Sequence, residues 1–169
     1  HQYENAAVAI IAVMEVKKLG YKITFKSIND GLSKTKWLCR LEKKSLKNIP
    51  VYLDGAHNLS GAQQLNNFFK NKKRKRWLVI GMMKNKDLKN YLLKTKKIFS
   101  GVIAIKIPGE KNSFTSSEIY KTSRNLKIKC IEKRNIIEAN KYLLNKINPE
   151  EIVISGSLYL VGKVRNLYI

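Results

Sequence analysis

The fold of this chain is decided by one stretch, Val51-Tyr52-Leu53-Asp54-Gly55-Ala56-His57-Asn58. An apolar strand ends there in an acid, a glycine and a histidine, and the residues that follow are typical of a helix. In open α/β folds, ligands bind in the crevice at the carboxyl ends of the strands. We therefore expect Asp54 and His57 to lie in a binding site at the edge of a sheet.

Strand and helix signals alternate from residue 51 to the end of the chain. The predicted strands cover residues 51–54, 77–81, 101–107, 128–131 and 152–155, and the predicted helices cover 60–70, 87–99, 116–125, 136–147 and 158–166. Each strand is a short and nearly continuous apolar run, as expected when helices cover both faces of a sheet. The pattern predicts a Rossmann-like α/β fold with a mostly parallel sheet and right-handed crossovers.

The first third of the chain has a different pattern. Helical spacing predicts helices at 5–19 and 23–32, and the stretch from 33 to 50 is polar and irregular. We place a domain boundary there, which divides the chain into residues 1–32 and 33–169. The chain opens on His1 and is helical almost at once, so we expect it to be the C-terminal part of a longer polypeptide.

A net charge of +22 suggests a nucleic-acid partner, because a basic field attracts phosphate. Only six of the 34 basic residues are Arg, however, and the aromatic residues are not spaced as a platform for stacking bases. The densest basic run, 70–76, falls between a helix and a strand, which favours a solvated loop. A basic, non-catalytic α/β module that binds nucleic acid is kept as an alternative.

Other classes of protein find little support in the sequence. The longest apolar stretch, 6–14, is far short of the roughly 20 residues that a bilayer requires, and the start of the chain has no signal-peptide pattern. Cys39 and Cys130 have neither metal-ligand spacing nor the pattern of a disulfide framework. We expect a cytoplasmic monomer with no membrane contact and no metal ligands of its own.

Four side chains carry the chemical hypotheses. Asp54 can accept hydrogen bonds from ribose hydroxyls, or it can simply cap the next helix. His57 can bind a carboxylate or take up an amine proton near neutral pH, or it can be a surface residue. Ser157 begins a helix after the strand 152–155, either as an anion site or as a cap. Arg40 can bind phosphate as a fork, pair with Glu42, or remain in water.

Five segments, taken in order, resemble the C-terminal part of folylpolyglutamate synthase/dihydrofolate synthase, in the Mur ligase superfamily. They are His1-Gln2-x-x-Asn5-Ala6-Ala7, Trp37-x-x-Arg40-Leu41-Glu42, Asp54-Gly55-Ala56-His57-Asn58, Gly81-Met82-Met83 with Lys86-Asp87, and Ser155-Gly156-Ser157-Leu158-Tyr159-Leu160-Val161-Gly162. Each segment is weak evidence alone, but five in order over nearly the whole chain are specific. Another Mur-type ligase is the remaining alternative.

The resemblance implies an ATP-dependent ligase. Such an enzyme phosphorylates a carboxylate of dihydropteroate or of a folate glutamate tail, and the amine of L-glutamate then attacks the acyl phosphate. Matched by position, Asn5 would contact adenine, Arg40 the ATP phosphates and Asp54 the ribose. His57, as a catalytic residue, and Ser157 would receive glutamate. Residues 1–32 would be the end of the central ATPase domain, and 33–169 the C-terminal domain.

The chain departs from the family pattern at one place that bears on the site. Leu38-Cys39 stands where the family usually has Pro-Gly, immediately before Arg40. The phosphate loop, the Mg²⁺ ligands and most of the pterin pocket would lie upstream of this chain. We therefore expect the chain by itself to have no ligase activity.

Overall fold

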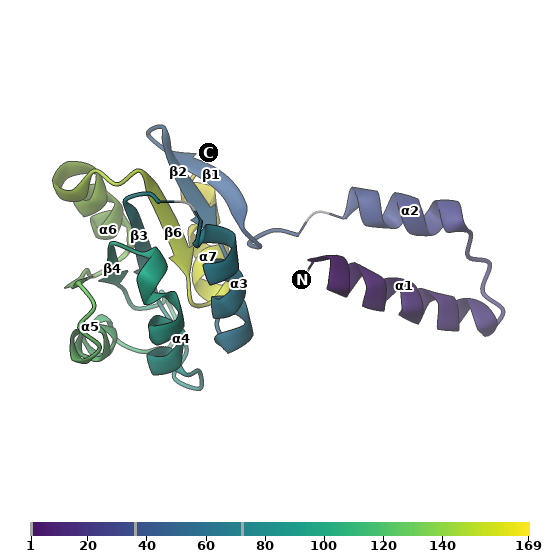
Figure 1. Cartoon of the computed structure of the whole chain (residues 1–169), viewed down its shortest axis with the longest axis horizontal. Helices are drawn as coiled ribbons and strands as arrows, with labels where there is room; N and C mark the ends of the chain where they lie inside the picture. The colour runs from purple at the N-terminus through teal and green to yellow at the C-terminus, as the bar shows by residue number, and fades with distance from the viewer. Residues whose placement is uncertain (1, 36, 72) are drawn as a thin grey trace. The chain divides into compact units, whose positions relative to one another are not determined.

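The computed structural model describes residues 2–35, 37–71 and 73–169. Within them the chain forms two compact units, His1–Trp37 and Leu38–Ile169. The first unit contains two helices, and the second is an α/β domain (Figure 1).

The first unit is a pair of helices, α1 (Gln2–Lys18) and α2 (Phe25–Lys34). Thr24 begins α2 with a capping box, in which its side chain accepts from the Ser27 amide at 3.1 Å. None of the described side chains of this unit is buried, although α1 is rich in apolar residues such as Val8 and Ile11. No helix among the described residues is long and apolar enough to cross a bilayer.

The second unit is built on a six-stranded sheet. Its strands are β1 (Glu42–Leu46), β2 (Ile49–Leu53), β3 (Arg76–Ile80), β4 (Gly101–Ala104), β5 (Cys130–Glu132) and β6 (Glu151–Ser155). They lie in the order β1-β2-β6-β3-β4-β5, and every neighbouring pair is parallel except β1 with β2. Consequently the carboxyl ends of β2, β6 and β3 lie next to one another at one edge of the sheet.

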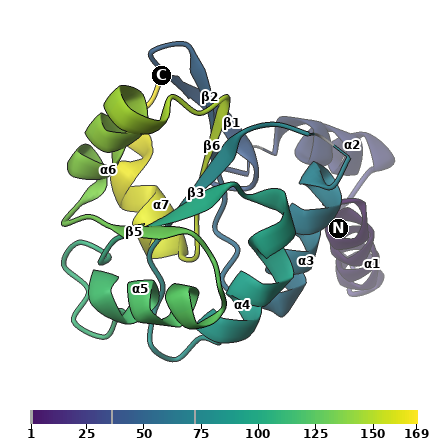
Figure 2. The ribbon, with the colours of Figure 1, turned by 60° about the vertical axis from the view of Figure 1, so that its left-hand side comes forward.

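Helices cover both faces of this sheet. They are α3 (Leu59–Phe69), α4 (Leu88–Thr95), α5 (Ser116–Asn125), α6 (Ile136–Tyr142) and α7 (Leu158–Val164). One core lies between the sheet and α6 with α7, and a second core lies between the sheet and α3, α4 and α5 (Figure 2). Alternate residues of β3 enter the two cores, Trp77 on one side and Leu78 on the other. The predicted Rossmann-like α/β fold is confirmed.

The antiparallel edge strand β1 was not predicted, and the expectation of an irregular stretch throughout 33–50 was wrong. Its sequence is polar because β1 is an edge strand whose side chains are at most partly buried. The hairpin turn uses Lys47 and Asn48, both at positive φ (47° and 68°), without the glycine that usually marks such a turn. On the outer side of β1, Ser45 exchanges two backbone hydrogen bonds with Ile169.

The basic run 70–76 also differs from its prediction as a solvated loop at its last residue. Arg76 is the first residue of β3 and is only 1% exposed. Its guanidinium pairs with Glu151 at 2.5 Å and lies 4.0 Å from the centre of the Phe69 ring. Because this charge is buried and paired, it adds nothing to a basic surface.

Candidate functional site

The loops that follow β2 and β6 are tied together at the carboxyl edge of the sheet. The Gly156 amide donates to the Ala56 carbonyl oxygen at 2.9 Å. The same oxygen accepts from the Ser155 hydroxyl at 3.2 Å, and Ser155 Oγ lies 2.9 Å from the Tyr91 hydroxyl. These groups are buried, and burial raises the pKa of Tyr91 above its ordinary value. These buried hydrogen bonds therefore hold the two loops in fixed positions. We call this group of Ala56, Tyr91, Ser155 and Gly156 the floor of the site.

A pocket of about 530 Å³ opens on this floor, between the loops that follow β2, β3 and β6. His57 and Ser157, predicted from separate motifs, both line it. Its other lining residues are Met83, Asn85, Lys86, Leu158 and Tyr159. The pocket thus combines the cationic, amide and hydroxyl groups of Lys86, Asn85 and Ser157 with apolar walls from Met83 and Leu158, so it offers a ligand both polar contacts and apolar surface.

His57 is held in one orientation by the backbone of its own loop. Its Nδ1 lies 2.9 Å from the Gly55 carbonyl oxygen. A carbonyl oxygen can only accept, so Nδ1 carries a proton. In the neutral ring Nε2 is then the atom with a free lone pair. This tautomer leaves an acceptor available to a ligand in the pocket.

Ser157 is the N-cap of α7 and is only 2% exposed. Its Oγ accepts from the Tyr159 amide at 3.1 Å, so the capping interpretation is correct. In its hydrogen bond with Tyr159, the Ser157 Oγ acts as the acceptor. The Ser157 hydroxyl proton therefore has no acceptor among the described residues. Ser157 can therefore cap its helix and still donate to a ligand.

Asp54 is 6% exposed and lies directly after β2. Its two carboxylate oxygens accept from different backbone amides, Oδ1 from Ala56 and Oδ2 from Leu41, both at 2.8 Å. Burial raises the pKa of this carboxyl, and the two amides and the charge of Arg40 offset part of that effect. Asp54 does not cap α3, because Asn58 does so through the Gly61 amide.

Arg40 lies close enough for its charge to act on Asp54, but it makes no hydrogen bond or ion pair with a described residue. The predicted alternative of a pair with Glu42 is wrong. Glu42 is bound instead by Arg165, whose Nη2 donates to Oε1 at 2.7 Å and whose Nε reaches both carboxylate oxygens. The Arg40 guanidinium is therefore free to meet an anion.

Asn5 belongs to the first compact unit, where it lies on α1 and is exposed. Asp54, Arg40, His57 and Ser157 all belong to the second unit. Of these four residues, His57 and Ser157 line the pocket, whereas Asp54 and Arg40 are not among its lining residues. The expected contact of Asn5 with adenine stays a prediction.

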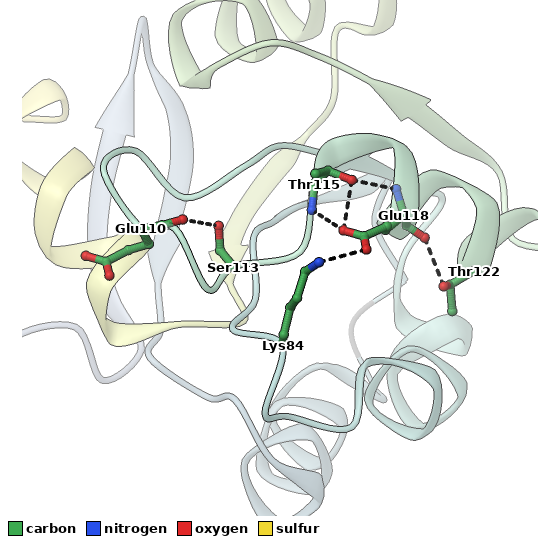
Figure 3. A network of polar contacts seen from close by, with 6 residues as sticks. All are labelled: Lys84, Glu110, Ser113, Thr115, Glu118 and Thr122. Atoms are coloured by element: carbon green, nitrogen blue, oxygen red, sulfur yellow. Dashed lines mark hydrogen bonds and ion pairs between the residues drawn. The ribbon is translucent and has the colours of Figure 1, made fainter.

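Several residues of the site region were not predicted from the sequence. The loop 83–86, which lines one side of the pocket, is tied to helix α5 by its own Lys84, whose Nζ pairs with Glu118 at 3.0 Å. Glu118 also closes the capping box of Thr115 at the start of α5 (Figure 3). Tyr91 and Ser155 support the floor of the pocket. Alternation of strands and helices places a loop, but it gives no signal for the side chains that support that loop.

The described residues contain no group of three or more His, Cys, Asp or Glu side chains placed to hold a metal ion. Glu42 is engaged by Arg165, and Asp54 alone supplies too few oxygen ligands for such an ion. The donor set of this edge therefore does not fit a Mg²⁺ site.

Comparisons with known proteins agree with the fold and with the family that the sequence resembles. Residues 37–167 match the family "Dihydrofolate synthetase, C-terminal domain". Folylpolyglutamate synthase of Lacticaseibacillus casei is 30% identical over 167 residues, and the match covers 98% of this chain and 38% of that protein. Dihydrofolate synthase/folylpolyglutamate synthase of Bacillus subtilis is 28% identical, over 98% of this chain and 38% of the relative.

A solved structure shows the same fold at lower sequence identity. E. coli FolC in complex with DHPP and ADP superimposes with a TM-score of 0.78 at 22% identity, over 96% of this chain and 38% of that one. The chain thus spans little more than a third of the length of these relatives. Since the family match extends over most of the sequence, the chain belongs to the dihydrofolate synthetase C-terminal domain family.

Proposed function

We propose that this chain acts as the C-terminal part of an ATP-dependent ligase that joins L-glutamate to dihydropteroate, to folate glutamate tails, or to both. The relatives with which it aligns over almost its whole length are named for these two reactions. In the proposed reaction a substrate carboxylate takes the γ-phosphoryl group of ATP and ADP leaves. The amino nitrogen of glutamate then attacks the acyl carbon, and phosphate departs.

The observation that carries the proposal is the convergence of His57 and Ser157 in one pocket at the carboxyl edge of the sheet. Glutamate presents two carboxylates and an amine. The Ser157 hydroxyl donates to a carboxylate, and the Nε2 lone pair of His57 takes the hydrogen bond or proton of the amine. Catalysis then rests largely on positioning, because the acyl phosphate already has a good leaving group.

Asp54 and Arg40 form the nucleotide side of the proposed site. Arg40 contributes a free guanidinium, whose planar fork matches phosphate oxygens. The Asp54 carboxylate already accepts two amides, and each oxygen keeps a lone pair for a ribose hydroxyl. ATP would be used together with Mg²⁺, and since this edge of the sheet does not fit that ion, we assign its ligands to the preceding part of the ligase.

We assign the helical pair of the first unit to the end of the central ATPase domain. A groove of about 210 Å³ between its helices is lined by apolar residues such as Ile10, Val13 and Ile28. No described side chain of the unit is buried, and two helices that bury so little are marginal on their own in water. Packing against further protein would supply the missing burial and would bring Asn5 to the adenine.

The test is ATP hydrolysis by the complete ligase, supplied with dihydropteroate or a folate, and with glutamate. We expect substrate-dependent turnover to fall about 100-fold in His57→Ala, the magnitude typical for loss of a general base. Ser123→Ala is a suitable control, because that buried hydroxyl donates to the Ile119 carbonyl within α5 and does not line the pocket. Thermal unfolding of each variant shows whether the fold is kept.

The outcomes separate the alternatives. Turnover that survives in His57→Ala would keep the ligase but remove His57 from its chemistry. Turnover only with a peptidoglycan precursor would indicate another Mur-type ligase. No ATP consumption with any acid substrate, together with salt-dependent binding of RNA or DNA, would favour the basic non-catalytic module.

A further inference from the structure

We infer that the ion pair between Glu42 and Arg165 is a positioning device for Arg40. It fixes the loop that carries Arg40, and it keeps the Glu42 carboxylate from capturing the guanidinium two residues away. The inference rests on the proposed function, in which Arg40 meets the phosphates of ATP.

The first support is the geometry of the ion pair. Arg165 Nε lies 3.0 and 2.9 Å from the two oxygens of Glu42, and Nη2 lies 2.7 Å from Oε1. The Arg165 and Glu42 side chains are only 28% and 16% exposed, so water screens them less than an ordinary surface pair. The same carboxylate accepts from the Cys39 amide at 2.9 Å. One acid thus joins the start of the loop to the end of the chain.

The second support is the backbone on either side of Arg40. Cys39 and Leu41 both lie in the left-handed region, with φ of 60° and 50°. Residues other than glycine rarely adopt it, because Cβ crowds the backbone. The Leu41 amide is held by Asp54, and the Cys39 carbonyl oxygen accepts from the Gly55 amide at 2.8 Å. Glu42, held by Arg165, supplies a further attachment of this strained loop.

The third support is charge. The two acids next to Arg40 are both occupied, Asp54 by two backbone amides and Glu42 by Arg165. The hydrogen bonds from Arg165 keep the pKa of Glu42 below its ordinary value, so it remains charged. Without Arg165, this charge would lie two residues from Arg40 and would compete with phosphate for the same guanidinium. By binding Glu42, Arg165 therefore keeps the Arg40 guanidinium available for phosphate, although it does not contact Arg40 itself.

The test is steady-state kinetics of the complete ligase with four variants. In Arg165→Gln we expect the KM for ATP to rise about tenfold, while kcat and the KM for glutamate stay within about twofold, because binding of ATP is what is lost. Adding Glu42→Gln to Arg165→Gln should lower the KM for ATP part of the way back, because no carboxylate then competes for Arg40 although the loop still lacks its attachment to Arg165. The amide oxygen introduced by Glu42→Gln can still accept from the Cys39 amide, but it carries no charge to attract Arg40.

Lys163→Gln is the matched control. Lys163 lies two residues before Arg165, and its Nζ pairs with Glu110 at 2.8 Å, away from the Arg40 loop. We expect the KM for ATP of this variant to equal that of the wild type. An Arg165→Gln enzyme that behaves like Lys163→Gln overturns the inference. So does a double variant that is as impaired as Arg165→Gln alone, since a merely structural role would give no rescue.

Arg40→Ala separates this inference from the proposed function. If Arg40→Ala leaves the KM for ATP unchanged, the role of Arg40 in the proposed function fails and the positioning role fails with it. If Arg40→Ala raises the KM and Arg165→Gln does not, only the positioning role fails. Should Arg165→Gln not fold, Arg165→Lys carries the test. The lysine of Arg165→Lys keeps the positive charge but lacks the planar fork of the guanidinium, so we expect the KM for ATP to rise about threefold. An unchanged KM for ATP overturns the inference.

Discussion

Two loops border the candidate site, and they are held in different ways. The loop 38–42 is held from within, by the buried Asp54 and the partly buried pair of Glu42 and Arg165. The loop 83–86 is held by a backbone hydrogen bond from the Lys84 amide to the Asn112 carbonyl oxygen, and by the pair of Lys84 and Glu118, whose side chains are 51% and 42% exposed. The first loop carries Arg40, and the second lines the pocket of His57.

The difference shows what each loop can contribute. Buried charges and left-handed residues fix the first loop in one geometry, at a cost in backbone free energy. An exposed ion pair adds little to stability and is screened by salt. We therefore expect the Arg40 loop to be rigid and sensitive to substitution, and the pocket loop to adjust more easily to a ligand.

The largest effect is expected at Gly156, which directly follows β6 and belongs to the floor of the site that supports both loops. Its φ is +102°, and a Cβ there would lie 2.8 Å from the Gly81 carbonyl oxygen and 2.7 Å from Ile80. Gly156→Ala should lower the free energy of unfolding by about 2–4 kcal/mol, since backbone strain and overpacking add. Urea unfolding of this chain, followed by the fluorescence of the buried Trp77, measures it.

Gly162→Ala provides the control for this measurement. Gly162 lies in α7, and apart from its chain neighbours and the backbone of its own helix no described atom lies within 4 Å of a Cβ built on it. Because alanine favours helix, this change should stabilise the chain by up to about 1 kcal/mol. If Gly156→Ala and Gly162→Ala proved equally stable, the floor would not be a rigid support for the two loops.

A smaller effect tests the strain in the Arg40 loop alone. Cys39→Gly and Cys39→Ala both remove the thiol, but only glycine is at ease at a φ of 60°. We expect the glycine variant to be more stable by about 1 kcal/mol. At Cys130, in strand β5, the order should reverse, because glycine weakens a strand. The same order at both cysteines in urea unfolding would contradict a strained loop.

The smallest effect concerns Glu118 beside the pocket loop. The Thr115 amide and Lys84 lower the pKa of its carboxyl from 4.5 to about 2. A lowered pKa in the folded state means that its stabilising effect is full above pH 4.5 and is lost as the pH falls toward 2. Glu118→Gln should therefore weaken the acid dependence of unfolding in this range. A variant with the same pH profile as the wild type would show that Glu118 does not contribute to it.

Much of the α/β architecture could be predicted because buried parallel strands leave a strong signal. The runs at Leu78 and Val153 are continuously apolar, and each is followed by a helical pattern. Strand β1 could not be found in the same way. An edge strand needs no apolar run, and the turn at Lys47 and Asn48 lacks the expected glycine.

The candidate site was predictable only in part. The motifs around Asp54, His57 and Ser157 stand at strand ends in the sequence, and parallel strands bring such ends to one edge. Partners distant in sequence carry no such signal. Nothing in the sequence pairs Glu42 with Arg165, which lies 123 residues later, and Arg40, two residues before Glu42, was an equally reasonable partner.

The sequence by itself determined the alternation of strands and helices, because hydrophobic burial follows local periodicity. That alternation also determined the edge of the sheet at which the polar groups gather. The tertiary structure alone decided which charges are engaged. A hydrogen bond forms only when its donor and acceptor are placed to within a few tenths of an ångström, and here they lie on segments that are remote along the chain. For that reason only the folded chain shows that Glu42 is taken by Arg165 and that Arg40 forms an ion pair with no residue that the structure describes.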